Sequence, residues 1–262
     1  MSSHQNAWFV RHKTGSTARA RLFCFPYAGG SSITYARWHA GLPPDIEVCA
    51  VELPGRGHRM RAVPPLFATA MQPLVGDLAS ALDRLFDVPC FFFGHSLGAV
   101  LAFACARALR RRSARLPEHL FVSARVAPHR PDPDATASAM SDDELVEMLR
   151  RGGGTPAEIL AEPELMALFL PIIRADYCLL SSYLHTPEPP LDCPITAFAG
   201  THDDRADPDD VADWRIHTSG AFAVERIEGN HFFVNTNRNL VIQRVARTIE
   251  SSLSRRSVAS SA

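Results

Sequence analysis

Six short runs of apolar residues, spaced along most of the chain, constrain the fold more than any other feature. Their residues are nearly continuously apolar rather than alternating, which is typical of strands buried on both faces of a parallel sheet. The runs are residues 21–25 (RLFCF), 46–51 (IEVCAV), 90–93 (CFFF), 119–123 (HLFVS), 195–199 (ITAFA) and 221–227 (AFAVERI). The pattern therefore predicts a central sheet that is covered on both sides.

Segments with helical spacing of apolar residues lie between these runs. The clearest is 67–86, in which Leu74, Leu78 and Leu82 recur every four residues. Alternation of strand and helix predicts βαβ units, so we expect an α/β fold with a mostly parallel central sheet flanked by helices. Beyond the last helix, the serine-rich tail is predicted to be partly disordered. The other expected helices are 97–112, 209–218 and 239–253, and the tail is 251–262.

The alternation breaks between the fourth and fifth runs, where we find helical patterns but no strand. A helix with a serine cap is expected at 141–150, and a strongly apolar one at 165–183. Three consecutive glycines, 152–154, separate them. We interpret the region at about 125–190 as a helical lid insertion over the carboxyl edge of the sheet, in a single domain spanning 1–262; the alternative is a plain packing subdomain.

Charge and hydropathy exclude several classes of partner. The formal net charge is −1, so no overall field favours nucleic acid or an anionic membrane. The longest apolar runs are far shorter than the about 20 residues that span a bilayer, and residues 1–14 lack the apolar run of a signal peptide. The 6 cysteines form no CxxC pair and are expected to be reduced and buried. We expect a cytoplasmic monomer without nucleic-acid or membrane partners.

A Gly-x-Ser-x-Gly pattern at 94–98 (GHSLG) follows the CFFF run and precedes a helix rich in alanine and leucine. This strand–turn–helix context is that of a nucleophile elbow, a bend that projects the serine from the backbone. The helix start behind Ser96 favours negative charge developing there. We therefore predict that Ser96 is the nucleophile, the alternative being a glycine-rich turn with a capping serine.

A serine hydroxyl needs a general base, and position must choose among 11 histidines. His231 directly follows the last predicted strand, at the sheet edge where Ser96 is expected, so we predict that it is the base. His95 adjoins the nucleophile, but neighbouring side chains at a sharp bend point apart. His58 lies in a loop that could line a pocket. Four other histidines are in segments that we interpret as surface: His119, His129, His185 and His217.

The base needs an acid that fixes its tautomer. Residues 200–204 (GTHDD) follow the ITAFA run, and the resulting chain order of serine, acid and histidine is that of α/β-hydrolases. We predict Asp203 as the acid, with Asp204 as the alternative. The nearby Asp207 is interpreted as the cap of the next helix, which begins at Pro208.

An oxyanion hole requires two backbone amides directed at the developing charge. One is expected from Leu97, directly after the nucleophile, and the other from Ala28, in the glycine-containing loop after the first run. A phosphate loop is the competing interpretation of that loop, but no GK[ST] sequence follows it. The chain has no HExxH or Cys/His spacing, so we expect no metal site.

Together these motifs resemble the type II thioesterases that accompany polyketide synthases and nonribosomal peptide synthetases. The resemblance extends from about residue 21 to 247 and includes a helical segment similar to that family's lid at 151–183. One position differs, because Asp204 stands where the family often has proline after the acid. The matching motifs are FPYAGGS at 25–31, ELPGRGHR at 52–59, FFGHSLGA at 92–99 and GNHFF at 229–233.

The resemblance implies an α/β-hydrolase fold and a serine thioesterase. Such enzymes hydrolyse acyl groups from the phosphopantetheine arm of acyl or peptidyl carrier proteins, which clears stalled or mis-primed synthases. The implied partners are those carrier proteins, and the enzyme itself uses no cofactor, since the phosphopantetheine belongs to the partner.

Three alternatives use the same residues or the same fold. The first is a general carboxylesterase or lipase-like hydrolase acting on oxygen esters through the same triad. The second is acyl transfer or cyclisation, as in terminal thioesterase domains, which the expectation of a free-standing chain disfavours. The third is a binding protein on a hydrolase fold, because fold alone does not define function.

Overall fold

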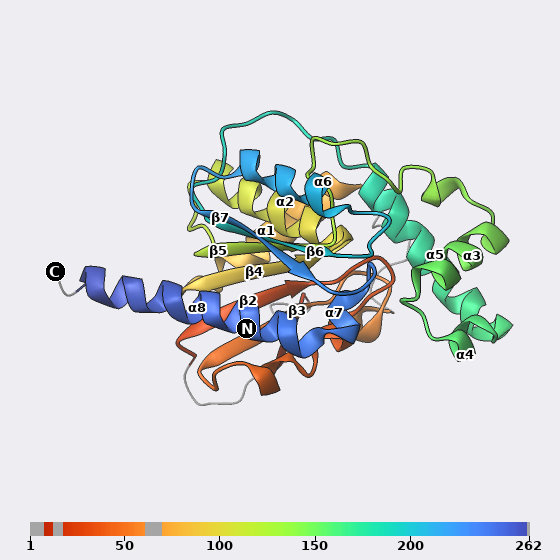
Figure 1. Cartoon of the computed structure of the whole chain (residues 1–262), viewed down its shortest axis with the longest axis horizontal. Coiled ribbons are helices and arrows are strands. Elements are labelled where there is room, and N and C mark those ends of the chain that lie inside the picture. Colours follow the sequence, from red (N-terminus) through yellow and green to blue (C-terminus); the bar gives the residue numbers. More distant parts are fainter. Residues whose placement is uncertain (1–7, 13–17, 61–69, 261–262) are drawn as a thin grey trace.

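The computed structural model describes residues 8–12, 18–60 and 70–260, and these form a central sheet flanked by helices (Figure 1). The strands in this part of the chain make one 7-stranded sheet in the order β1-β3-β2-β4-β5-β6-β7. All neighbours pair in parallel except β1, which runs antiparallel to β3. The strands are β1 (Phe9–His12), β2 (Ala20–Phe25), β3 (Ile46–Val51), β4 (Cys90–His95), β5 (His119–Ser123), β6 (Ile195–Gly200) and β7 (Phe222–Ile227).

Each of the six predicted apolar runs is a strand, and the mostly parallel α/β sheet is confirmed. Sequence analysis missed β1. Its four residues, FVRH, form an edge strand in which only Phe9 is buried, so the segment carries no continuous apolar signal. It pairs with β3 through Phe9 opposite Val51 and His12 opposite Val48.

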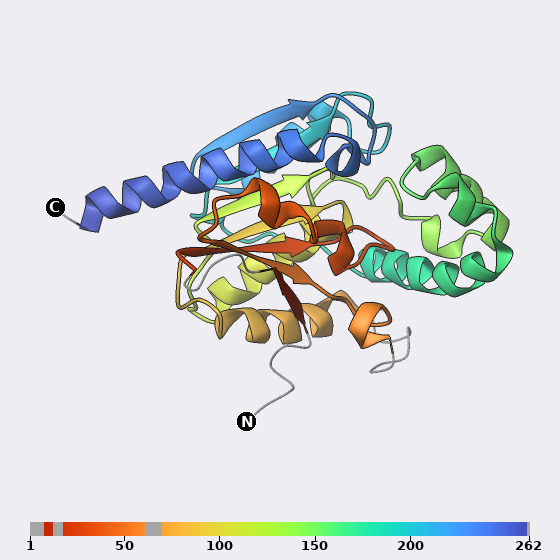
Figure 2. The ribbon, with the colours of Figure 1, turned by 90° about the horizontal axis from the view of Figure 1, so that it is seen from below.

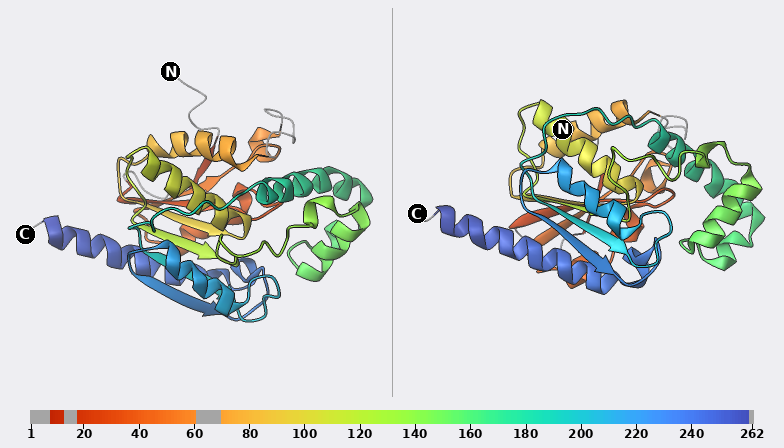
Figure 3. Two further views of the ribbon diagram at one scale, coloured as in Figure 1. Left: turned by 90° about the horizontal axis from the view of Figure 1, so that it is seen from above. Right: turned by 45° about the horizontal axis from the view of Figure 1, so that its top comes forward.

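Successive residues of the strands point to opposite faces of the sheet and build two separate cores. Phe23 and Phe92 face α1 (Met71–Asp83) and α2 (Leu97–Arg111). Phe91 faces α8 (Arg238–Ser260) on the opposite side. Figures 1 and 3 show the same layering, with α6 (Pro208–Ala212) on the α2 side. Burial on both faces is the reason why the strands read as unbroken apolar runs.

The prediction that the tail at 251–262 is partly disordered is wrong for the described residues. Helix α8 continues to Ser260 and projects beyond the sheet (Figure 2). Ile249 and Leu253 still pack on the core, and no proline or glycine interrupts the helix after them. Extending an existing helix adds one hydrogen bond per residue without a new nucleation cost. Of the predicted helix at 67–86, residues 67–69 lie outside the described residues.

A helical insertion joins β5 to β6 and lies beyond the edge of the sheet toward which the parallel strands point (Figure 3). It contains three α-helices in the described chain: α3 (Asp142–Gly152), α4 (Ala157–Leu160) and α5 (Pro163–Ser181). The predicted serine cap of α3 is present as a capping box between Ser141 and Glu144. Leu179 and Leu180 of α5 join the main core, so this helix is attached to the sheet domain.

Two histidines interpreted from sequence as surface residues are buried. His119 bonds Thr196 Oγ1 at 2.8 Å, and His217 bonds His129 Nδ1 at 3.0 Å. Each side chain is only 7% exposed. Burial is the main cause that lowers the pKa of both to about 4. The sequence did not predict this burial, because the hydrogen-bond partners of both rings lie far away in the chain: Thr196 for His119 and His129 for His217.

We expect the stability of the fold to decrease as the pH falls from 6.5 toward 4. The unfolded chain binds a proton at His119 in this range and the folded chain does not, so protonation favours unfolding. His119→Gln should flatten the dependence of unfolding free energy on pH between 5 and 6 by up to about 1 kcal/mol per pH unit, measured by urea denaturation. Exposed His202→Gln is the control, and equal slopes in both variants would contradict the prediction.

Candidate active site

The bend between β4 and α2 holds Ser96 in a backbone conformation that residues other than glycine rarely adopt, with φ 54° and ψ −115°. Glycines make this bend possible. A Cβ on Gly94 would collide with the carbonyl group of Gly98, and a Cβ on Gly98 with the carbonyl oxygen of Phe25. The Gly-x-Ser-x-Gly pattern is therefore a packing requirement where α2 crosses the end of β2. The strained turn directs Ser96 away from both elements, as a nucleophile elbow does.

His231 lies in the loop after β7 and is 3% exposed. Its Nδ1 bonds the carboxylate of Asp203 at 2.9 Å, which leaves Nε2 as the ring nitrogen available to a nucleophile. Its backbone carbonyl accepts a hydrogen bond from Nε2 of His95, the residue before Ser96, at 2.9 Å. The bend and the histidine loop are thus joined directly, and Ser96 and His231 lie on the same edge of the sheet.

The position of His95 agrees with its exclusion as the base. The ring is fully buried and its Nδ1 bonds Ser123 Oγ at 2.9 Å. Burial, followed by the neighbouring His231, lowers the pKa of His95 well below its ordinary value, so the ring is neutral. Its bond to the His231 carbonyl gives it a positioning role that sequence reasoning missed, because the partner is 136 residues away.

The structure distinguishes the two candidate acids. Asp203 is buried and bonds His231, whereas Asp204 is exposed. Asp203 also accepts the backbone amide of Arg205 at 3.0 Å, which holds the carboxylate in place. The acid and histidine loops are bonded to each other through the His202 amide and the Gly229 carbonyl at 2.9 Å. The geometry therefore favours Asp203 over Asp204 as the acid partner of His231.

The two predicted oxyanion donors both have unused amides. None of the hydrogen bonds within the described residues uses the amide of Ala28 or Leu97. The neighbouring amides are occupied: Gly29 donates to Asp176 Oδ2 at 2.7 Å, and Gly30 to the Tyr27 carbonyl at 2.8 Å. Leu97 begins α2, where amides have no partner within the helix and favour negative charge.

A buried ion pair beside this loop was not found by sequence analysis. Arg56, in the loop after β3, bonds both carboxylate oxygens of Asp176 on α5, at 2.6 and 2.7 Å. Burial opposes the charge of Arg56, but the adjacent carboxylate outweighs it and raises the pKa of the guanidinium. One signal was available, since Asp176 is an isolated acid in a strongly apolar helical pattern. His58, which from its sequence position could line a pocket, is exposed on this same loop and lines neither of the two cavities described below.

A small cavity of about 210 Å³ lies between the insertion and the oxyanion loop. Its walls are mainly apolar and include Ala28, so the cavity reaches the predicted oxyanion hole. Side chains from α5 and from the residue after His231 form much of the lining, namely Met166, Phe169, Ile173 and Phe232. The site therefore offers an apolar compartment that borders the predicted oxyanion loop and the residue after His231.

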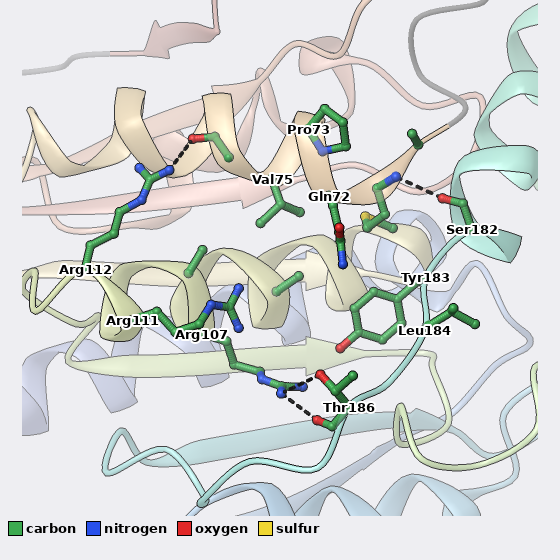
Figure 4. Close-up of a pocket in the computed structure, with 15 residues that line it drawn as sticks. Gln72, Pro73, Val75, Arg107, Arg111, Arg112, Ser182, Tyr183, Leu184 and Thr186 are labelled. Atoms are coloured by element: carbon green, nitrogen blue, oxygen red, sulfur yellow. Dashed lines mark hydrogen bonds between the residues drawn. The ribbon is translucent and has the colours of Figure 1, made fainter.

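A larger groove of about 660 Å³ lies elsewhere, between α1, α2 and the chain after α5 (Figure 4). Its lining contains neither Ala28 nor any residue next to Ser96, Asp203 or His231, whereas Ala28 and Phe232, the residue after His231, line the smaller cavity. Arg107 at its border already donates to the Thr186 carbonyl at 2.6 Å, and Ser182 accepts the Met71 amide at 2.9 Å. We therefore place the chemistry at the smaller cavity.

The described residues contain no group of three or more histidine, cysteine, aspartate and glutamate side chains arranged to hold a metal. Within the same residues, no helix is long and apolar enough to cross a membrane.

Comparisons with known proteins agree with this geometry. A family model described as a thioesterase domain matches residues 20–253. The gramicidin S biosynthesis protein GrsT of Aneurinibacillus migulanus is 38% identical over 241 residues, which cover 92% of this chain and 93% of that protein.

Two solved structures are similar over most of the chain. The thioesterase RedJ from the prodiginine pathway of Streptomyces coelicolor has a TM-score of 0.82 and 40% identity, covering 88% of this chain and 85% of its own. The type II thioesterase BorB from the borrelidin biosynthetic cluster has a TM-score of 0.83 and 36% identity, covering 96% and 100%. With the sheet topology, these similarities confirm the predicted α/β-hydrolase fold.

The contrast between the two acids can be tested directly. We expect Asp203→Asn to lower kcat for thioester hydrolysis by about three to four orders of magnitude, because asparagine cannot hold the reactive tautomer of His231. Exposed Asp204→Asn is the matched control and should stay within about twofold of the unaltered chain, since its side chain does not contact His231. Equal losses in the two variants would refute the assignment.

Proposed function

The chain belongs to the thioesterase domain family, and from this premise we propose that it is a serine thioesterase acting on carrier-bound acyl groups. Its substrates are acyl chains on the phosphopantetheine arm of acyl or peptidyl carrier proteins. Its role is to remove chains that stall or mis-prime a polyketide or nonribosomal peptide synthase. The observation that carries the proposal is the buried contact of His231 with Asp203 beside the Ser96 bend.

In the first half of the reaction, Ser96 Oγ attacks the thioester carbonyl and His231 Nε2 takes the hydroxyl proton. Asp203 stabilises the resulting imidazolium through Nδ1. The amides of Ala28 and Leu97 bind the oxygen of the tetrahedral intermediate. The carbon–sulfur bond then breaks, and His231 gives its proton to the departing pantetheine thiolate, which leaves an acyl-serine.

In the second half, His231 takes a proton from water while the water oxygen attacks the acyl-serine carbonyl. The same amides bind the second oxyanion, and collapse of the intermediate returns the proton to Ser96 and releases the carboxylic acid. The proposed chemistry needs no cofactor, because serine, histidine and water supply every group that forms or breaks a bond.

The helical insertion fits the role of a lid over this site. Its helices border the apolar cavity next to Ala28, so an acyl chain bound there would be separated from bulk water. Motion of such a lid would control entry of the pantetheine arm. The expected monomeric state and cytoplasmic location stay predictions.

Support for carrier-bound substrates over oxygen esters comes from the relatives. GrsT is named for gramicidin S biosynthesis, and BorB is described as a type II thioesterase of a biosynthetic cluster. Both resemblances extend over more than nine-tenths of this chain, and the family model matches residues 20–253. A general carboxylesterase remains the second candidate function, since the triad itself does not distinguish sulfur from oxygen esters.

Hydrolysis of an acyl-loaded carrier protein tests the proposed function. We expect a higher kcat/KM for an acyl-carrier thioester than for a p-nitrophenyl ester of the same acyl chain, measured by release of free acid. Ser96→Ala should lower carrier hydrolysis more than about 10³-fold and keep the same melting temperature. Preference for the oxygen ester would favour the carboxylesterase instead, and full activity of Ser96→Ala would refute the nucleophile.

The cavity generates a prediction about acyl length. Met166→Ala removes side-chain volume from the cavity and makes room for more of a long acyl chain. Each additional buried methylene is worth about fourfold. The kcat/KM ratio of an octanoyl over a butanoyl thioester should therefore rise by about tenfold, which corresponds to between one and two more buried methylenes. Leu168→Ala is the matched control, because this residue of the same helix is 68% exposed. A ratio that changes equally in both variants would place the acyl chain elsewhere.

A further inference from the structure

We propose that Asp176 on α5 is a positioning residue for the oxyanion hole, which it sets by clamping the turn at residues 27–30 together with Arg56. The inference rests on the proposed function, because it concerns the same reaction. It assigns a role to a charged pair that touches neither Ser96 nor His231 through any hydrogen bond in the described chain.

Both ends of the clamp hold the same turn. Asp176 Oδ2 accepts the Gly29 amide at 2.7 Å, and Arg56 Nη1 donates to the Gly30 carbonyl at 2.8 Å. The same Arg56 nitrogen bonds Asp176 Oδ2 at 2.7 Å, which closes a ring of charged and backbone groups. Asp176 is fully buried and Arg56 is 4% exposed, so water does not compete for these bonds.

The turn itself shows how the clamp acts on Ala28. Gly29 has φ 77°, as at the third position of a type II turn, and the Gly30 amide bonds the Tyr27 carbonyl. The carbonyl and amide of one trans peptide point in opposite directions, so the Ala28 amide points out of the turn. The next peptide directs the Gly29 amide to Asp176. Release of Gly29 would let these two peptides rotate and would misdirect the Ala28 donor.

Helix α5 also contacts the turn through packing. A Cβ placed on Gly29 would lie 2.8 Å from Ile173 Cγ1, three residues before Asp176 on the same helix. The turn is therefore seated on α5 by shape as well as by charge. A buried ion pair alone is weak evidence for a stabilising role, but here the pair also satisfies two backbone groups of a single turn. This arrangement favours orientation of the turn as the function of the pair.

The test compares Asp176→Asn with Glu188→Gln. Glu188 is a matched control, because its carboxylate pairs with Arg107 and Arg110 of α2 and it does not line the cavity. We expect Asp176→Asn to lower kcat at least tenfold, since loss of one oxyanion donor typically costs about 10²–10³-fold. KM should change by less than about twofold, and Glu188→Gln should retain the activity of the unaltered chain.

An alkyl trifluoromethyl ketone provides the second readout. Ser96 Oγ adds to its carbonyl carbon, the hydroxyl proton passes to His231, and the oxyanion of the adduct occupies the hole. The inhibition constant should rise in Asp176→Asn by the same factor by which kcat/KM falls. The proposal would be overturned if Asp176→Asn changed neither kcat nor the inhibition constant. It would also be overturned if this variant raised KM and left kcat unchanged, because that result would indicate that Asp176 acts only in lid closure.

A second variant guards against loss of the fold. Arg56→Met with Asp176→Leu removes both buried charges, which proteins often tolerate, and still deprives Gly29 and Gly30 of their partners. The same loss of kcat and of inhibitor affinity is expected. Activity equal to that of the unaltered chain in this folded double variant would overturn the proposal.

A measurement on the unaltered chain needs no substitution. The ¹⁵N-labelled Gly29 amide should exchange slowly with solvent, and addition of the ketone should shift the Ala28 amide while Gly29 stays protected. Rapid exchange of Gly29, or loss of its protection when the inhibitor binds, would overturn the proposal. The ketone does not require a carrier protein, so failure of carrier hydrolysis would refute the proposed function and leave this test of the clamp intact.

Discussion

The close approach of α2 to the end of β2 is the contact on which the rest of the site depends. Gly98 lies against the Phe25 carbonyl, and Gly94 against Gly98, at distances that admit no side chain. The contact places the first turn of α2 beside the loop that contains Ala28. Among the described residues, the Leu97 amide in this turn bonds no acceptor. Ser96 has a positive φ at the same bend, so the predicted nucleophile and both predicted oxyanion donors lie around one close contact.

The loops that contain Asp203 and His231 are bonded to each other, and the His231 loop is bonded to this bend. His95 joins the bend to the His231 carbonyl, and the His202 amide joins the acid loop to the histidine loop. The insertion reaches the same loops from outside the sheet. Asp176 bonds the oxyanion loop, and the next residue, Tyr177, accepts a hydrogen bond from Arg205 of the acid loop at 2.9 Å. Helix α5 therefore bonds two loops of the site and also lines the cavity beside them.

Patterns confined to a few neighbouring residues predicted the site most closely. The strand–bend–helix around Ser96 needs only local glycines, and His231 needs only its place after the last strand. The choice between Asp203 and Asp204 was harder, because adjacent acids in one loop have the same local chemistry. The structure separates them by turning Asp203 inward to His231 and leaving Asp204 exposed. Strand β1 escaped prediction because an edge strand with one buried residue has almost no apolar pattern.

Periodicity and short-range spacing were enough to predict the α/β alternation, the bend at Ser96 and the helical insertion, because each depends on residues a few positions apart. The chain order of the proposed serine, acid and histidine came from the same patterns. The folded chain alone shows which acid meets His231, that His119 and His217 are buried, and that Arg56 and Asp176 bond the turn at Gly29 and Gly30. These contacts join residues from 26 to 147 positions apart. Side chains so distant in the chain meet only after the sheet has formed, and no local pattern records their partner.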